Sequence, residues 1–200
     1  ALDCVNLTIR QGEVHGLIGE NGAGKSTIIK VLAGVYAPDE GTISFMGQEY
    51  RNESISQALQ RGISVIYQEL CLVPHMKVYE NIMLGFEVGK GEAYSAAKTR
   101  EKAGEIISML DLDLPLDEEV YKLDIAVQQM VEIAKAFSRN SKLIIMDEPT
   151  SSLSDKEVKI LYRIIHNLKV KGISTLFVSH KLEEVVEICD RITVFRDGQS

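Results

Sequence analysis

A stretch near the N-terminus has the residue types and spacing of a loop that binds phosphate. It runs Gly19-Glu20-Asn21-Gly22-Ala23-Gly24-Lys25-Ser26-Thr27 and fits the pattern of a glycine, four residues and then Gly-Lys-Ser/Thr. Glycines let the backbone fold back so that successive N–H groups point into one concavity. Lys25 would add a mobile charge for the outer phosphates, and Ser26 would offer a hydroxyl to a magnesium ion. The stretch therefore predicts a site for phosphate groups with Mg²⁺.

Two carboxylates follow an apolar run in the second half of the chain. Leu143–Met146 is apolar, and Asp147 and Glu148 come directly after it. Ligands of parallel sheets bind beyond the carboxyl ends of the strands, so two acids there fit a site for magnesium and phosphate. We expect Asp147 to orient the metal through a water and Glu148 to act as general base on the attacking water. The alternative is a strand that ends at a solvated acidic turn, and the phosphate loop weakens it.

Two further polar side chains end strand-like runs. His180 follows Thr175–Val178 and precedes a helical pattern, so it is expected at the same edge, where it could donate a hydrogen bond to a γ-phosphate. Gln68 follows Ile63–Ile66 in the same way, and its amide oxygen could join the magnesium shell and sense the nucleotide. The remaining histidines are interpreted as structural or exposed; they are His15, His75 and His166.

Alternating strands and helices must position these residues. Apolar stripes with helical spacing cover 127–137, 158–168 and 182–189, and a helix is expected at Ile28–Ala33. Such alternation predicts an α/β fold with a mostly parallel sheet covered on both faces. The runs that predict strands are Val5–Ile9, Val14–Ile18, Thr42–Phe45, Ile63–Ile66, Leu143–Met146, Thr175–Val178 and Ile192–Phe195.

The middle of the chain differs from both ends. Strand signal is almost absent from Tyr79 to about Ser138, where a helix-favouring stretch (93–110) precedes an acidic linker (111–119). We expect a helical subdomain at 79–138, inserted between two parts of a core at 1–78 and 139–200. The early strand and the turn signal Asp197-Gly198, with no returning strand, predict a segment truncated at both ends.

The overall composition limits the classes of function. Hydrophobic residues make up 45% of the 200 residues and charged residues 26%, as in a globular domain. A net charge of −7 argues against nucleic-acid binding through a basic surface. No apolar run approaches the roughly 20 residues that span a bilayer. Three widely spaced cysteines are interpreted as free thiols rather than a metal site; they are Cys4, Cys71 and Cys189.

Taken together, these motifs resemble the nucleotide-binding subunit of ATP-binding-cassette (ABC) transporters. The resemblance covers essentially the whole chain and includes the phosphate loop, Gln68, the strand ending at Glu148, the run Pro149–Leu153 and His180. Several short sequence segments resemble, more closely, the first cassette of tandem-cassette importers of monosaccharides such as ribose, xylose or galactose. These segments are Leu32–Gly41, Gln68–Leu70, Gln128–Ala136 and Ser179–Glu184.

The resemblance implies the fold of P-loop NTPases and hydrolysis of ATP with Mg²⁺. It also implies permease membrane subunits and a second cassette in the same full-length chain as partners. A sugar-binding protein would be an indirect partner, and nucleic acid would not be a partner. The protein would lie on the cytoplasmic face of a bacterial membrane. In the family, the segment matching Cys71–Gly85 receives a short helix of the permease.

The segment that matches the family's signature loop departs from it. In the family, Leu-Ser-Gly-Gly-Gln of one cassette completes the ATP site of the other; here the segment is Leu123-Asp124-Ile125-Ala126-Val127. A carboxylate at Asp124 would repel a γ-phosphate, by roughly 4 kcal/mol for unit charges at about 4 Å and a dielectric of 20. Alternatively Asp124 caps the helix that begins near Ala126, and both can be true. The loop expected to cross between cassettes is Ser151, Ser152, Leu153 and Ser154, with Ser154 where Asp is common in the family.

Three functions therefore stay open at the level of sequence. The leading one is an ATPase that drives sugar import, with one weak composite site. The second is a soluble cassette ATPase with a regulatory or nucleic-acid role, although long insertions and basic arms are not evident in the segment. The third is a cassette that binds ATP without hydrolysing it, against which Glu148 and His180 argue.

Overall fold

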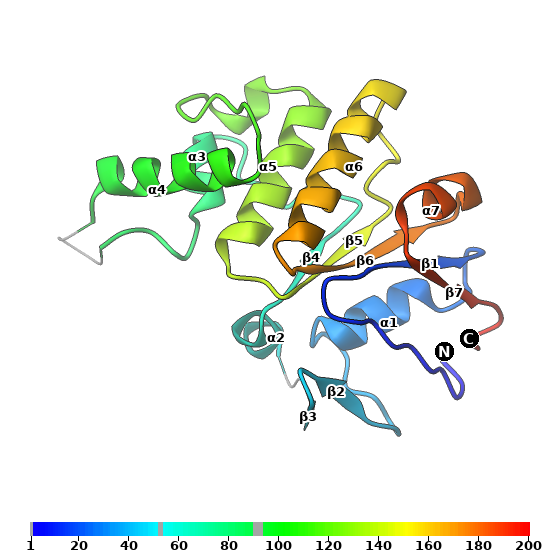
Figure 1. Cartoon of the computed structure of the whole chain (residues 1–200). Helices are drawn as coiled ribbons and strands as arrows, with labels where there is room; N and C mark the ends of the chain where they lie inside the picture. The colour runs from blue at the N-terminus through cyan, green and yellow to red at the C-terminus, as the bar shows by residue number, and fades with distance from the viewer. Residues whose placement is uncertain (1, 52–53, 90–93) are drawn as a thin grey trace.

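The structure, a computed structural model, describes residues 2–51, 54–89 and 94–200. Five of the described strands form one sheet in the order β4-β5-β6-β1-β7, and every pairing in it is parallel. Figure 1 shows the helices above and below this sheet. The strands are β1 (Val14–Gly19), β4 (Ile63–Ile66), β5 (Leu143–Asp147), β6 (Ser174–Ser179) and β7 (Arg191–Phe195).

Helices cover both faces of the sheet. One face packs against α5, α6 and α7, and the other packs against α1 and α2 (Figure 1). The helices are α1 (Lys25–Leu32), α2 (Ile55–Arg61), α3 (Val78–Ile82), α4 (Ala96–Met109), α5 (Ile125–Ser138), α6 (Asp155–Val170) and α7 (Leu182–Ile188), with a 3-10 turn η2 at Val120–Lys122. None of the helices in the described part of the chain is long and apolar enough to cross a bilayer.

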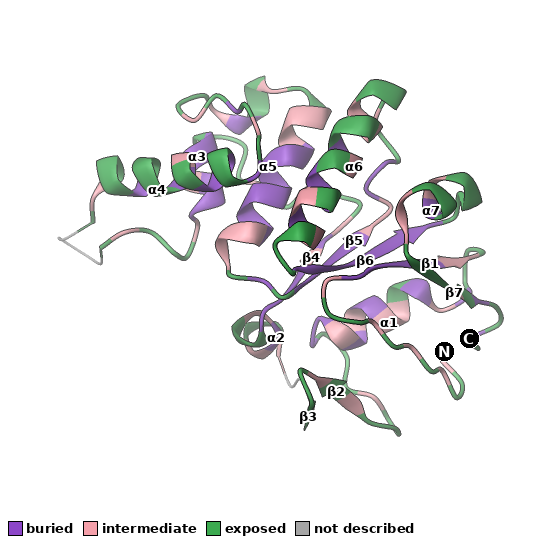
Figure 2. Ribbon diagram, in the orientation of Figure 1, coloured by how far each residue is buried: buried purple, intermediate pink, exposed green. Residues whose placement is uncertain are grey.

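Burial on both faces explains why β5 is apolar at every position from Leu143 to Met146. In β5, Ile144 and Met146 belong to the core beneath α5 and α6, whereas Leu143 and Ile145 belong to the core beside α1. Figure 2 shows the central strands buried along their length. A strand covered on both sides loses the alternation of a half-exposed strand. The predicted α/β class is therefore confirmed.

Six of the seven predicted strands are present, but Val5–Ile9 is not a strand. Its alternating apolar residues pack against the core beside α1 without joining a sheet, so the pattern reports a buried face and not backbone pairing. The strand β3 (Gln48–Tyr50) was not predicted, because its first two residues are polar and exposed. It pairs antiparallel with β2 (Ile43–Phe45).

The predicted turn at Asp197-Gly198 is present. Both residues have positive φ, 52° and 82°, and Arg196 and Gln199 form an isolated antiparallel bridge across the turn. Two central residues with positive φ are typical of a tight hairpin turn.

The helices predicted in the middle of the chain are also present. α4 matches the stretch expected at 93–110, of which Ala93 lies outside the described residues. α3, α4 and α5 contact one another, and α5 also contacts β4 of the sheet. The division into a core and a helical subdomain stays a prediction.

Two glycines give a matched test of packing. A methyl group on Gly16 of β1 would overlap Val185 Cγ1 and lie 3.0 Å from Cys189 Sγ, because α7 crosses closely over the strand. We expect Gly16→Ala to lower the free energy of unfolding by about 1–3 kcal/mol through overpacking. In α4 a methyl on Gly104 would lie 3.6 Å from Leu116 Cδ1, an ordinary contact. Gly104→Ala should therefore raise that free energy by roughly 0.5–1 kcal/mol. Urea unfolding of both variants measures these changes. If the free energy of unfolding changes in the same direction in both, the packing argument is contradicted.

Candidate active site

The phosphate loop connects β1 to the N-terminus of α1. Gly22 and Gly24 have φ of 86° and 107°, a region that residues with a side chain rarely adopt. Gly24 is the N-cap of α1, and a methyl group on it would lie 2.6 Å from Leu2 Cδ2. The glycines are therefore required by the backbone itself, as the motif predicts.

Lys25 is buried beneath the loop, with 7% of its surface exposed. Its Nζ donates hydrogen bonds to the carbonyl oxygens of Gly19 (2.6 Å) and Glu20 (3.1 Å). The ammonium group is thus held in the concavity of the loop by acceptors that phosphate oxygens can replace. A buried charge with only carbonyl partners favours an anionic ligand.

One cavity of about 440 Å³ brings together most of the predicted site. Two predicted loop residues shape this cavity without lining it. Ala23 is buried in the core, and a methyl group on Gly19 would lie 2.5 Å from the carbonyl oxygen of Phe195. The cavity is lined by Glu20, Asn21, Gly22, Gly24, Lys25, Ser26, Thr27, Gln68, Asp147 and Glu148.

The two acids lie in different environments. Burial and the neighbouring Glu148 carboxylate raise the pKa of Asp147, and the ammonium of Lys25 partly offsets this. Glu148 has a φ of 47°, which is rare for a residue with a side chain, and its N–H donates to the Val178 carbonyl at 2.9 Å. Backbone strain of this kind costs about 1–3 kcal/mol and clusters at functional sites.

His180 lies beside Glu148, although 32 residues separate them in the chain. Its Nδ1 is 3.0 Å from Glu148 Oε1, and the His180 side chain is 52% exposed against 18% for Glu148. The two residues expected to act in catalysis are therefore in direct contact at the carboxyl ends of β5 and β6.

The residues around the cavity fit a triphosphate with Mg²⁺. A divalent cation beside Asp147 would favour its charged form, against the burial and the neighbouring Glu148 carboxylate that raise its pKa. Ser26 and Gln68 supply oxygen atoms on the wall of the same cavity. Within the described ranges, no group of three or more His, Cys, Asp or Glu side chains could hold a metal alone. Magnesium is usually held by one or two carboxylates together with substrate phosphates and waters.

The segment 123–127 does not line this cavity. Asp124 is the N-cap of α5, and its Oδ1 accepts a hydrogen bond from the Val127 N–H at 2.8 Å. The capping role is confirmed, with α5 beginning at Ile125. It stays a prediction that this segment faces a nucleotide on a second cassette. The segment comprises Leu123, Asp124, Ile125, Ala126 and Val127.

The loop expected to cross between cassettes leads into α6. Ser151 and Ser152 are exposed and Leu153 is partly buried. The Ser154 N–H and hydroxyl donate to Glu157 Oε2 at 2.6 and 2.7 Å, which starts the helix. Ser154 thus has a local structural role at the position where Asp is common in the family.

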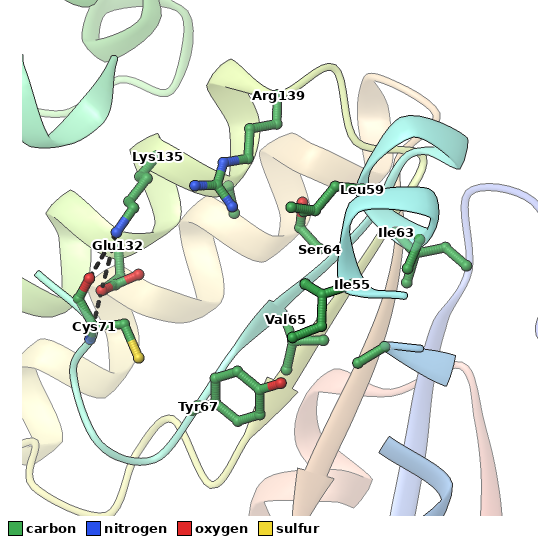
Figure 3. A pocket seen from close by; sticks show the side chains of 13 residues that line it. Ile55, Leu59, Ile63, Ser64, Val65, Tyr67, Cys71, Glu132, Lys135 and Arg139 are labelled. Carbon is green, nitrogen blue, oxygen red and sulfur yellow. Dashed lines mark hydrogen bonds and ion pairs between the residues drawn. The ribbon is translucent and has the colours of Figure 1, made fainter. Parts of the chain in front are cut away.

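A second cavity, of about 170 Å³, lies beside the loop that follows Gln68 (Figure 3). Cys71 is held on both sides of its backbone by α5. Its N–H donates to Glu132 Oε1 at 2.8 Å, and its carbonyl accepts from Lys135 Nζ at 2.7 Å. The loop that carries Gln68 is therefore tied directly to α5, the helix that Asp124 caps.

Sequence reasoning missed a group of residues behind the catalytic pair. Glu184 accepts hydrogen bonds from Thr150, Ser179 and Lys181. A glutamate four residues after His180 was the only local signal for it. Its contact with Thr150 spans 34 residues of chain, which no local pattern records.

Comparisons with known proteins agree with this geometry. The family described as ABC transporter matches residues 2–151. The chain is 49% identical over 199 residues to a galactose/methyl galactoside import ATP-binding protein of Haemophilus influenzae, covering 100% of this chain and 39% of that protein. It is 47% identical over 199 residues, with the same coverage, to a putative ribose/galactose/methyl galactoside import ATP-binding protein of Burkholderia cenocepacia. The chain thus spans about two fifths of the length of these relatives.

Solved structures of ATP-binding cassettes share the fold. The ADP conformation of a cassette from an ABC transporter superimposes with a TM-score of 0.86 and 31% identity, over 100% of this chain and 82% of that one. A dimeric cassette in a post-hydrolysis state bound to ADP and Pi gives a TM-score of 0.83 and 26% identity, over 99% of this chain and 87% of that one.

Proposed function

The chain belongs to the ABC transporter family, and from this premise we propose that it binds ATP and hydrolyses it to drive sugar import. The single observation that carries the proposal is the cavity in which the phosphate loop, Gln68 and the two acids meet. The similarity to sugar import ATP-binding proteins supports a sugar as the transported substrate. Galactose or a galactoside is the cargo class that these relatives favour.

The proposed reaction follows from the placement of the residues. The loop amides and Lys25 hold the phosphates, and bound Mg²⁺ would neutralise charge on their oxygens. Glu148 accepts a proton from a water molecule as the water oxygen bonds to the γ-phosphorus. The bond from the γ-phosphorus to the bridging oxygen breaks, and its electron pair leaves with ADP. His180 orients Glu148 through Nδ1, which donates to the ionised carboxylate, so Nε2 would donate to the γ-phosphate when the imidazole carries both protons.

The proposal includes partners. The chain spans 39% of its relatives, so a second cassette in the same full-length chain is expected. Permease subunits would dock beside Cys71, where the second cavity lies between α2, β4 and α5 (Figure 3). A sugar-binding protein would act through the permease, and the site of action would be the cytoplasmic face of the membrane.

Reconstitution tests the proposal. Full-length protein should hydrolyse ATP in the presence of Mg²⁺, and with its permease and binding protein in vesicles it should accumulate a labelled galactoside only when ATP is supplied. Hydrolysis without any effect of a permease would favour a soluble regulatory ATPase. ATP binding without hydrolysis would favour a binding-only cassette.

The degenerate signature supports a further part of the proposal, that the ATP site completed by Asp124 turns over slowly. Asp124→Ser and Asp124→Asn remove the negative charge but keep a side chain that caps α5 well. We expect either variant to raise the ATPase rate of the assembled transporter by about tenfold, equal to about 1.4 kcal/mol of barrier. Asp124→Glu keeps the charge and serves as the control. If the ATPase rate is unchanged in both neutral variants while thermal unfolding shows that α5 is intact, slow turnover at the site completed by Asp124 is contradicted.

A further inference from the structure

A partly buried carboxylate lies directly behind the catalytic pair and does not line the nucleotide cavity. Glu184 is in the first turn of α7, with 12% of its side chain exposed. Its Oε2 accepts hydrogen bonds from the hydroxyls of Thr150 (2.7 Å) and Ser179 (2.9 Å). Its Oε1 accepts from Lys181 Nζ at 2.9 Å.

These hydrogen bonds join the two loops that carry the catalytic residues. Thr150 lies two residues after Glu148, and Ser179 lies immediately before His180. The Ser179 hydroxyl oxygen also accepts the Lys181 N–H at 3.0 Å, which fixes the turn around His180. One carboxylate oxygen therefore ties the loop after β5 to the loop after β6.

The hydrogen bonds are strong enough to matter. Burial raises the pKa of Glu184, but the hydrogen bonds from Lys181, Thr150 and Ser179 more than offset it, so the pKa lies below its ordinary value. The carboxylate is therefore ionised at neutral pH, and hydrogen bonds to a charged group are the stronger kind.

The Glu148 backbone needs such support. Its left-handed conformation is strained and persists only where the surroundings hold it. One restraint is the hydrogen bond from its N–H to the Val178 carbonyl. The hydrogen bond from Thr150 to Glu184 restrains the chain on the other side of Glu148.

We propose that Glu184 is a positioning residue that fixes the Glu148–His180 pair by holding together the two loops that carry them. The proposal rests on the ATPase function proposed above. Glu184 acts only through Thr150 and Ser179, so its loss should affect turnover and leave the nucleotide cavity formed.

The first test compares three variants of the full-length protein. Glu184→Ala should lower kcat for ATP hydrolysis at least tenfold while the KM for ATP and the affinity for ATP change less than about twofold. Glu184→Gln should recover much of the loss, because its amide oxygen can still accept from both hydroxyls and only the Lys181 contact is removed. Glu187→Ala, an exposed acid one turn later in α7, is the matched control and should behave as wild type.

The second test does not depend on hydrolysis. In nucleotide-free protein, Glu184→Ala should speed amide hydrogen exchange in the segments 147–153 and 178–182 and nowhere else. A general loss of stability would instead speed exchange across the whole protein. Thr150→Val should show the same local pattern, and adding it to Glu184→Ala should produce little further change, because Glu184→Ala already removes the hydrogen bond between Thr150 and Glu184.

The outcomes separate the two proposals. If the wild type does not hydrolyse ATP, the proposed function fails and the exchange experiment still decides whether Glu184 joins the loops. If the wild type is active and Glu184→Ala matches Glu187→Ala in kcat or in local exchange, the positioning role is overturned. Global destabilisation by Glu184→Ala without rescue by Glu184→Gln would also overturn it.

Discussion

Glu148→Gln should lower ATP turnover at least a hundredfold and leave ATP binding intact. The amide has nearly the shape of the carboxylate and can still meet His180, which lies 3.0 Å away in the native protein. It cannot accept the proton of the attacking water, and general base catalysis contributes about 10²–10⁴-fold. Lys25 and the loop amides, which hold the phosphates, are unchanged. Steady-state hydrolysis and nucleotide titration measure the two effects separately.

A charge-matched control accompanies this variant. Glu105→Gln removes an exposed carboxylate that pairs with Lys102 at the surface of α4. It should have no effect on either measurement, because exposed ion pairs contribute little. Turnover of Glu148→Gln equal to that of the wild type would refute the assignment of the base. Lost ATP binding would show instead that the variant disturbs the cavity.

The second large effect is expected from Lys25→Ala. Phosphate would lose a charge-assisted hydrogen bond worth about 1.5–3 kcal/mol, so ATP affinity should fall by roughly 10- to 150-fold. Turnover should fall as well, because Lys25 also meets charge that develops on the outer phosphates. Calorimetric titration with ATP and a non-hydrolysable analogue measures the affinity.

Lys30→Ala is the matched control for Lys25→Ala. Lys30 lies in the last turn of the same helix, with its Nζ 5.4 Å from the Tyr36 ring centroid, and it does not line the cavity. Removing it changes the net charge equally, so a long-range electrostatic effect would appear in both variants. Equal losses of affinity would contradict a direct contact between Lys25 and phosphate.

Several parts of the fold could be predicted because their signals are local. The glycines at 22 and 24 are demanded by positive φ within the loop itself. The run Leu143–Met146 is apolar because both faces of β5 are covered. The stripes of α5 and α6 follow from helical periodicity. Each pattern is a property of residues that are close in the sequence, so each predicts its element without any distant contact.

Other predictions failed where local pattern and tertiary contact differ. Val5–Ile9 alternates as a strand does, but its backbone has no place in the sheet, and burial of one face alone produced the pattern. Gln48–Tyr50 lacks the pattern and is nevertheless a strand, because a tight turn brings it beside β2. Pairing of backbones depends on register and geometry, which side-chain hydropathy reports only indirectly.

The sequence by itself determined the family, the phosphate loop and the identity of the residues expected to act on ATP. The tertiary structure alone decided that Glu148 is strained and touches His180, and that Glu184 joins the two catalytic loops. The physical reason is that residue types and short spacings are encoded locally. The Glu148–His180 and Thr150–Glu184 contacts instead join side chains more than 30 residues apart, and they form because parallel strands place their carboxyl ends at one edge of the sheet.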